Sequence, residues 1–132
     1  MMTPKEKEFV FYKLFNEGMF ELNAYNIETI LAEKVETVLS RAEFNTRPRD
    51  FYDIYILTKT QVFNKNEFQL SLHNTANHRK SIDKIHAHIN IIEEIKKSEI
   101  LQSRWNKYRK DYKYASDISY EEVIESLISL FN

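Results

Sequence analysis

Cysteine is absent from the 132-residue sequence, and glycine and proline are almost absent. Without cysteine the chain has no disulfide, no thiolate zinc site and no cysteine nucleophile, which fits a reducing cytoplasm. The single glycine, Gly18, excludes a P-loop or a dinucleotide-binding motif, because both need several glycines where the backbone approaches phosphate. With only two prolines as well, the composition favours long helices joined by polar turns.

Long apolar runs and a strong charge of one sign are also missing. No apolar segment approaches the roughly 20 residues that a membrane helix needs, and the N-terminal MMTPKEKE lacks the apolar core of a signal peptide. The net charge of −1 gives no global attraction to polyanions. The four histidines lack metal-binding spacing, so we expect no zinc site. These features predict a cytoplasmic protein without membrane contact, built as one domain over residues 1–132.

A β-hairpin is predicted near the N-terminus. The segment 9–15, FVFYKLF, is β-branched and aromatic, the segment 19–25, MFELNAY, alternates, and Asn16-Glu17-Gly18 between them is a turn signal. Two strands alone are marginally stable in water. The hairpin over 9–25 therefore packs on helices or belongs to a larger sheet.

The rest of the chain, residues 26–131, predicts about six helices. Apolar residues recur at helical spacing over 25–41, 48–59, 64–79, 82–95, 98–112 and 120–131. Capping signals support these limits: Asn26, Asn64 or Asn66, Pro48, and a Ser119/Glu122 capping box. The predicted fold class is α+β, predominantly α-helical, with the hairpin followed by the helices.

Two cations lie where a core pattern would place apolar side chains. On the first predicted helix, Lys34 is seven residues after Ile27 and Arg41 is seven residues after Lys34, so the three share one face. An unpaired, desolvated charge costs several kcal/mol or more, so both cations need partners. Asp50 and Asp53, three residues apart on the next helix, are the candidates.

Two interpretations of these four residues remain open from spacing alone. They can form a structural ion-pair network that ties two helices together. They can also form a phosphate and metal site, in which lysine and arginine hold a triphosphate while aspartate coordinates Mg²⁺ or positions a nucleophile. The neighbouring aromatics Phe51, Tyr52 and Tyr55 are interpreted as core rather than as a base-stacking platform.

The segment around these residues resembles a known family. AYNIETILAEKVETVLSR followed by NTRPRDFYDIYIL is similar to the C-terminal signature of the AbiEii/AbiGii toxins, nucleotidyltransferase-like proteins of bacterial abortive-infection (phage resistance) and type IV toxin–antitoxin systems. The resemblance rests on Ala32-Glu33-Lys34, Arg41 and Arg47-x-Arg49-Asp50-x-x-Asp53, with a looser similarity around Trp105, Tyr108 and Tyr114-Ala115.

The resemblance implies roles for these residues. It implies that Asp53, more than Asp50, contributes to catalysis, and that a group of cations contacts nucleotide phosphates: Lys34, Arg41, Arg47 and Arg49. It also implies that the hairpin is the end of a larger mixed sheet. The family is thought to transfer nucleotides, in some members onto tRNA ends, with a neighbouring antitoxin as partner.

The family's upstream Gly-Ser turn and Asp-x-Asp pair are missing from this sequence. Those aspartates hold the catalytic metals in the family, so we expect a truncated C-terminal fragment with no complete metal site. Mg²⁺ and a nucleoside triphosphate are then expected only together with the N-terminal half, and the chain alone should be inactive. The alternative is a non-catalytic helical interaction module that binds an antitoxin, the missing half or, through the hairpin edge, a second copy.

Residues 96–113 are strongly basic, with seven Lys or Arg against two acidic residues. One interpretation is the solvated side of an amphipathic helix. The other is an RNA-contacting surface, since clustered cations supply phosphate affinity.

Overall fold

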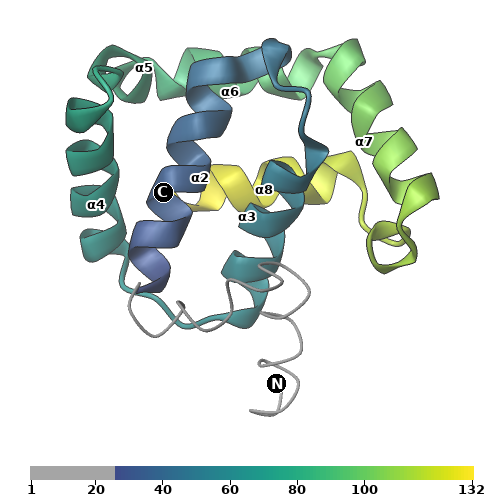
Figure 1. Ribbon diagram of the computed structural model, residues 1–132, viewed down its shortest axis with the longest axis horizontal. Helices are drawn as coiled ribbons and strands as arrows, with labels where there is room; N and C mark the ends of the chain where they lie inside the picture. Colours follow the sequence, from purple (N-terminus) through teal and green to yellow (C-terminus); the bar gives the residue numbers. More distant parts are fainter. Residues whose placement is uncertain (1–25) are drawn as a thin grey trace.

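The computed structural model describes residues 26–132, and all regular structure in that range is helical (Figure 1). The elements are α2 (Ile27–Arg41), η2 (Ala42–Phe44), α3 (Pro48–Thr60), α4 (Lys65–His78), α5 (Ile82–His86), α6 (His88–Lys97), α7 (Glu99–Asp111), η3 (Lys113–Ala115) and α8 (Tyr120–Ser129). The helices cover one another's apolar faces, and these buried residues form one continuous core.

The predicted α+β fold class was therefore wrong. Seven α-helices, two short 3-10 helices and no strand make up residues 26–132, because the helical region builds its core without a sheet. The hairpin predicted over 9–25 lies outside the described residues.

The capping signals in the sequence are confirmed. The Asn26 side chain accepts a hydrogen bond from the Thr29 N–H at 2.7 Å, and the Asn64 side chain accepts one from the Glu67 N–H at 3.0 Å. Pro48 lies in the first turn of α3. The capping box predicted for the last helix is formed at the start of α8. Local side-chain chemistry thus fixes where these helices begin.

One predicted helix is divided in two. Residues 82–95 were expected to form a continuous helix, but α5 ends at His86 and α6 begins at His88. The His88 ring nitrogen Nδ1 lies 2.8 Å from the Ile85 carbonyl oxygen, a group that a continuous helix would use for its own backbone bonding. The same ring stacks on Phe131 at a centroid distance of 4.2 Å. A tertiary contact therefore accompanies the break.

Helix α2 lies at the centre of the core. It packs against α3 on one side and α4 on the other, while α5 and α6 cross its far end and α8 contacts α3 (Figure 1). Leu31, Val35 and Val38 are completely buried on it. Helix α7 contributes Trp105, whose indole N–H donates to the Ile118 carbonyl at 2.9 Å. The site residues described below lie where α2 meets α3.

Two buried glutamates of α2 hold the two ends of α4. The Glu28 carboxylate accepts the backbone N–H of Asn64, the N-cap of α4, at 2.9 Å. The Glu36 carboxylate accepts hydrogen bonds from Arg79 and from Ser81 just beyond the end of α4. Because the earlier glutamate contacts the start of α4 and the later one contacts its end, the two helices run parallel.

The end of α4 is shaped to reach Glu36. The Ser81 N–H donates to the Ala76 carbonyl at 2.7 Å and the Lys80 N–H donates to the Asn77 carbonyl at 3.3 Å, which is the Schellman pattern. Lys80 has a φ of 60°, a left-handed conformation that glycine usually supplies at this position. This turn brings the Ser81 hydroxyl to 2.8 Å from Glu36 Oε2.

Replacing this carboxylate tests its structural role. Burial raises the pKa of Glu36, but hydrogen bonds from Ser40, Arg79 and Ser81 outweigh burial and leave the pKa below its ordinary value. The unfolded chain then binds the proton more readily than the folded chain. The contribution of Glu36 to stability is therefore present above the ordinary glutamate pKa and is lost as pH falls through the folded pKa. Glu36→Gln should lower the free energy of unfolding by about 1–3 kcal/mol at neutral pH, measured by urea denaturation.

The control for this prediction is Glu33→Gln, an exposed position on the same helix. Its effect should stay within about 0.5 kcal/mol. Equal losses in the two variants, or a Glu36→Gln effect that does not shrink in acid, would contradict the assigned role.

Candidate functional site

The Lys34 ammonium lies between the two predicted aspartates. Its Nζ atom is 2.9 Å from Asp53 Oδ2 and 3.6 Å from Asp50 Oδ1. The Lys34 side chain is 23% exposed, whereas the Asp53 side chain is 1% exposed and the Asp50 side chain 3%. The sequence prediction that Lys34 pairs with this aspartate pair is therefore confirmed, and the cation retains contact with solvent.

Asp50 is positioned by the connector that precedes α3. Buried Asn45 donates from Nδ2 to Asp50 Oδ2 at 3.4 Å and accepts the Arg47 N–H at its Oδ1 at 2.8 Å. From α7, Arg104 donates to the carbonyl oxygens of Glu43 at 2.9 Å and Asn45 at 3.0 Å, which fixes the connector. Sequence reasoning missed this support, because neither side chain lies in a periodic pattern.

The pKa of Asp53 is raised above its ordinary value. Burial raises its pKa, and Asp50 adds to this, while Lys34 and Arg49 act in the opposite direction without outweighing burial. Arg49 Nε is 3.8 Å from Oδ1, an ion-pair distance that is too long for a hydrogen bond. Apart from these ion pairs, both Asp53 oxygens are buried without a hydrogen bond of good geometry. Such a carboxylate costs stability and is typical of functional sites.

The three arginines predicted to bind nucleotide lie differently from one another. Arg41 is exposed at the last residue of α2, and it forms no ion pair with any residue of the range 26–132. The expectation that it lies within the buried stripe was wrong, because the helix ends there. Arg47 is exposed at the start of α3, and Arg49 is 42% exposed beside Asp53. The structure thus brings Lys34 and Arg49 together with the aspartates, while Arg41 stays apart from them in the ion pairing.

The aspartate pair does not fit a magnesium ion on its own. The Lys34 ammonium already lies within 2.9 Å of Asp53, where a metal would have to bind. Within residues 26–132, no group of three or more His, Cys, Asp or Glu side chains could hold a metal ion. These residues are therefore assigned no role as ligands of a catalytic metal.

The basic segment 96–113 is largely engaged within the fold. Arg104 holds the connector described above, and Arg109 donates twice to the Ser116 carbonyl, at 2.9 and 3.2 Å. Lys97 pairs with Glu93 at 3.4 Å and Lys107 with Asp111 at 3.0 Å. The remaining cations, Lys96, Lys110 and Lys113, are exposed. RNA contact through this segment stays a prediction with fewer free cations to carry it.

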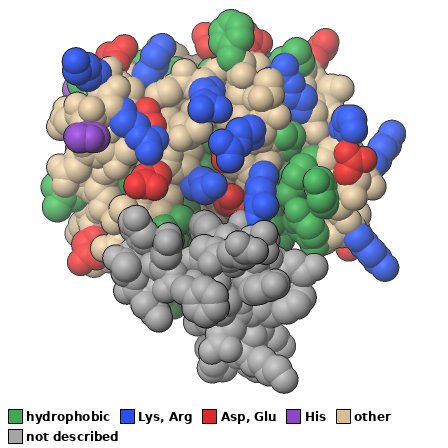
Figure 2. All heavy atoms as spheres, in the orientation of Figure 1, with side chains coloured by type: hydrophobic (Ala, Val, Ile, Leu, Met, Phe, Trp, Pro, Cys, Tyr) green, Lys and Arg blue, Asp and Glu red, His purple; other side chains and the backbone are tan. Residues whose placement is uncertain are grey.

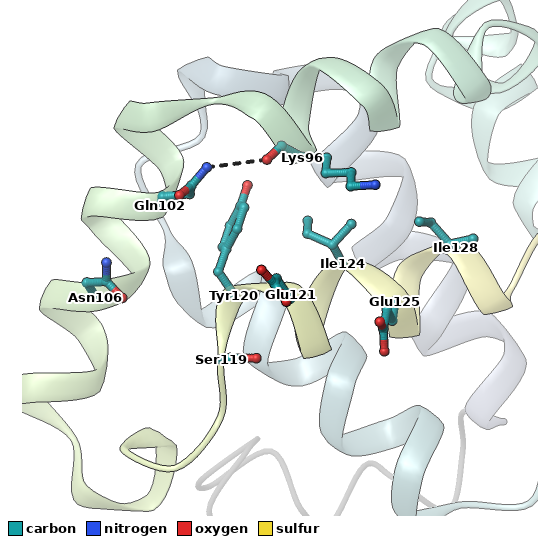
Figure 3. A pocket seen from close by; sticks show the side chains of 9 residues that line it. All are labelled: Lys96, Gln102, Asn106, Ser119, Tyr120, Glu121, Ile124, Glu125 and Ile128. Carbon is teal, nitrogen blue, oxygen red and sulfur yellow. Dashed lines mark hydrogen bonds between the residues drawn. The ribbon is translucent and has the colours of Figure 1, made fainter.

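An open pocket lies between α6, α7 and α8 (Figure 3). Its volume is about 670 Å³, and its lining combines Ile124 and Ile128 with the acidic side chains Glu121 and Glu125 and with Lys96. None of the predicted site residues lines it. The pocket therefore does not correspond to the lysine–aspartate site.

The resemblance to nucleotidyltransferase-like toxins rested on Lys34, Arg41 and the segment from Arg47 to Asp53. Comparison with family models confirms this class: residues 2–126 match the family described as "Nucleotidyl transferase AbiEii toxin, Type IV TA system". The chain belongs to the AbiEii family. An antitoxin is the partner that this family implies.

Searches of curated proteins and of solved structures gave no match. Among residues 26–132, no helix combines the length and the apolar character needed to cross a bilayer.

The raised pKa of Asp53 predicts the effect of neutralising it. The folded chain binds this proton more tightly than the unfolded chain, so stability falls as pH rises from the ordinary aspartate pKa through the raised folded pKa. The penalty is present at neutral pH. Asp53→Asn should therefore unfold with an equal free energy, or one higher by about 1 kcal/mol, in urea denaturation at neutral pH.

Lys34→Met provides the matched comparison. It removes the cation that opposes the burial penalty of Asp53, so we expect a loss of about 1–3 kcal/mol. Most of this loss should be recovered when Asp53→Asn is combined with it. If Asp53→Asn instead destabilises the chain as much as Glu36→Gln, the pair is a structural ion-pair network.

Proposed function

We propose that this chain supplies the phosphate-binding part of an AbiEii-type nucleotidyltransferase toxin. In this proposal Lys34 contacts the phosphates of the nucleotide, and the metal-binding carboxylates come from the Gly-Ser and Asp-x-Asp segment that this sequence lacks. The observation that carries the proposal is a partly exposed ammonium fixed against two buried aspartates in a family of nucleotidyl transferases.

The hydrogen-bonding capacity of Lys34 supports a phosphate role. An ammonium group has three N–H donors. Two carboxylate oxygens lie near Nζ, and the 23% exposure of the side chain leaves a donor direction open to solvent. An anionic phosphate oxygen can approach from that side while the aspartates hold the ammonium in place.

The burial of both aspartates defines how we propose that they act. A side chain that is 1% exposed cannot contact a substrate in this arrangement, so Asp53 is proposed as a positioning residue that acts through Lys34. Asp50 has the same role through its weaker contact with Lys34. This proposal differs from the direct catalytic role that the family resemblance implied for them.

The neighbouring arginines are proposed to extend the phosphate site. Arg49 is partly exposed beside Asp53, and Arg47 is exposed two residues earlier, at the N-cap of α3. On the face shown in Figure 2, Lys and Arg side chains gather around acidic ones near the middle of the molecule. A guanidinium group binds phosphate in a bidentate manner that an ammonium cannot provide.

The phosphate role is tested by titrating the isotope-labelled chain with sodium tripolyphosphate and following backbone amide shifts by NMR. We expect weak binding, with a dissociation constant on the order of millimolar, that needs no magnesium. Lys34→Gln should abolish it, because the substitution removes the charge that attracts the phosphate. Lys84→Gln, an exposed lysine on α5, should leave it unchanged.

Activity is tested by supplying the Gly-Ser and Asp-x-Asp segment of the family as a second polypeptide. Nucleotidyl transfer should then depend on Lys34 and be lowered by Asp53→Asn. Phosphate binding that survives Lys34→Gln would remove the basis for the proposal. Tight, magnesium-dependent binding of a nucleoside triphosphate by the chain alone would show that the metal ligands lie within it.

A further inference from the structure

Four tyrosines from three segments form one cluster next to the lysine–aspartate site. The ring centroids of Tyr52 and Tyr114 are 4.8 Å apart, those of Tyr108 and Tyr112 are 4.7 Å apart, and those of Tyr112 and Tyr114 are 5.5 Å apart. The Tyr108 and Tyr114 hydroxyls lie 2.6 Å from each other. Helices α3 and α7 and the short η3 therefore meet in a tyrosine cluster, which we define as these four residues.

The tyrosine cluster is continuous with the candidate phosphate site. Arg49, Tyr52 and Asp53 are spaced i, i+3 and i+4 on α3, so they share one face of that helix. Burial is the main cause that raises the pKa of Tyr52, to about 12, and the Asp53 charge also raises it while Arg49 lowers it. The same two charges act on Tyr108. Tyr52, which contacts Tyr114, therefore lies on the same face of α3 as Arg49 and Asp53.

The members of the cluster differ in exposure. Tyr52 is 7% exposed and Tyr108 8%, so these two rings serve as the base of the cluster. Tyr112 is 47% exposed and Tyr114 is 40% exposed, so part of each side chain is accessible to solvent. The hydroxyl contact with Tyr108 restrains Tyr114, so this exposed ring is pre-positioned rather than loose.

We propose that Tyr112 and Tyr114 form a stacking platform for a nucleobase. An exposed aromatic face beside phosphate-binding cations matches the two parts of a nucleotide, because a base stacks on an aromatic ring while its phosphates pair with Lys or Arg. Tyr52 links the two parts, because its ring contacts Tyr114 and it lies on the same face of α3 as Arg49. The proposal rests on the proposed function for its phosphate half.

The nucleobase has two possible sources with the same chemistry. It belongs either to the nucleoside triphosphate that Lys34 would contact or to the nucleic acid strand that accepts the nucleotide. Stacking depends on the flat face of the base rather than on its edges, so little base selectivity is expected in either case.

The experiment compares three probes on the full chain by NMR titration: a nucleoside triphosphate, sodium tripolyphosphate and a short single-stranded RNA. The test variant is Tyr112→Ala combined with Tyr114→Ala. Because stacking contributes roughly 1–3 kcal/mol per base, this variant should weaken binding of a base-containing probe by at least about fivefold and leave tripolyphosphate unchanged. Tyr112→Phe keeps that ring and leaves the Tyr108–Tyr114 hydroxyl contact intact, so it should retain binding.

Each outcome is decisive for the platform. A loss confined to the nucleoside triphosphate assigns the base to the nucleotide, and a loss confined to RNA assigns it to the acceptor. Equal binding in wild type and the alanine variant, or no binding of either base-containing probe by wild type, overturns the platform. The tripolyphosphate titration tests the phosphate proposal separately. That proposal fails if wild type does not bind tripolyphosphate, or if Lys34→Gln binds it equally well.

The matched control is Phe44→Ala, which removes an aromatic ring that is 84% exposed on η2. It should leave binding of all three probes unchanged. Circular dichroism melting curves of each variant show that the helices are intact, and the fluorescence of the single tryptophan, Trp105, reports on the cluster because its ring stacks on Tyr108 at 5.5 Å. A loss of binding in Phe44→Ala equal to that in the tyrosine variant would also overturn the proposal.

Discussion

Helix α2 can occupy the centre of this fold only because its buried charges find partners on the helices around it. An unpartnered charge in such a position would cost several kcal/mol, a large share of the stability of a domain of this size. Glu28 and Glu36 are satisfied by the two ends of α4, and Lys34 by the aspartates of α3. The apolar stripe of α2 brings the helices together, and these polar contacts fix how they are aligned.

The buried carboxylates Glu36 of α2 and Asp53 of α3 differ in how completely their charge is compensated. Glu36 receives hydrogen bonds from three side chains, which keep its pKa low in spite of burial. Asp53, the main partner of Lys34, is buried with ion-pair contacts from Lys34 and Arg49 that do not outweigh burial, so its pKa stays raised. Selection for stability alone favours the first arrangement. The second persists where a function offsets its cost, which supports the view that Lys34 is held for a ligand.

Periodicity and spacing predicted the local features of this fold and failed where contacts between distant residues decide. The caps at Asn26 and Asn64 follow from short-range rules. The Lys34–Asp53 pair joins two helices, and it was predicted because a charge on an apolar helix face needs a partner. The roles of Asn45 and Arg104 depend on the meeting of α7 with a connector some 60 residues earlier, which no local pattern encodes. The break after α5 is likewise accompanied by a contact between distant residues, because the His88 ring stacks on Phe131. The predicted α+β fold class was wrong because the core of residues 26–132 is formed by helices alone. The strands had been predicted in 9–25, which lies outside the described residues.

The distribution of cations also changes where nucleic acid contact should be sought. By charge count alone, residues 96–113 are the obvious surface, but Arg104 and Arg109 are bound to backbone carbonyls. What this segment brings to the site is aromatic rather than basic, since Tyr108 and Tyr112 meet Tyr52 and Tyr114 beside Arg49. Phosphate attraction from α2 and α3 and stacking from α7 and η3 are therefore complementary contributions to one surface. A ligand that combines a base with phosphate gains from both, whereas inorganic phosphate gains from only one.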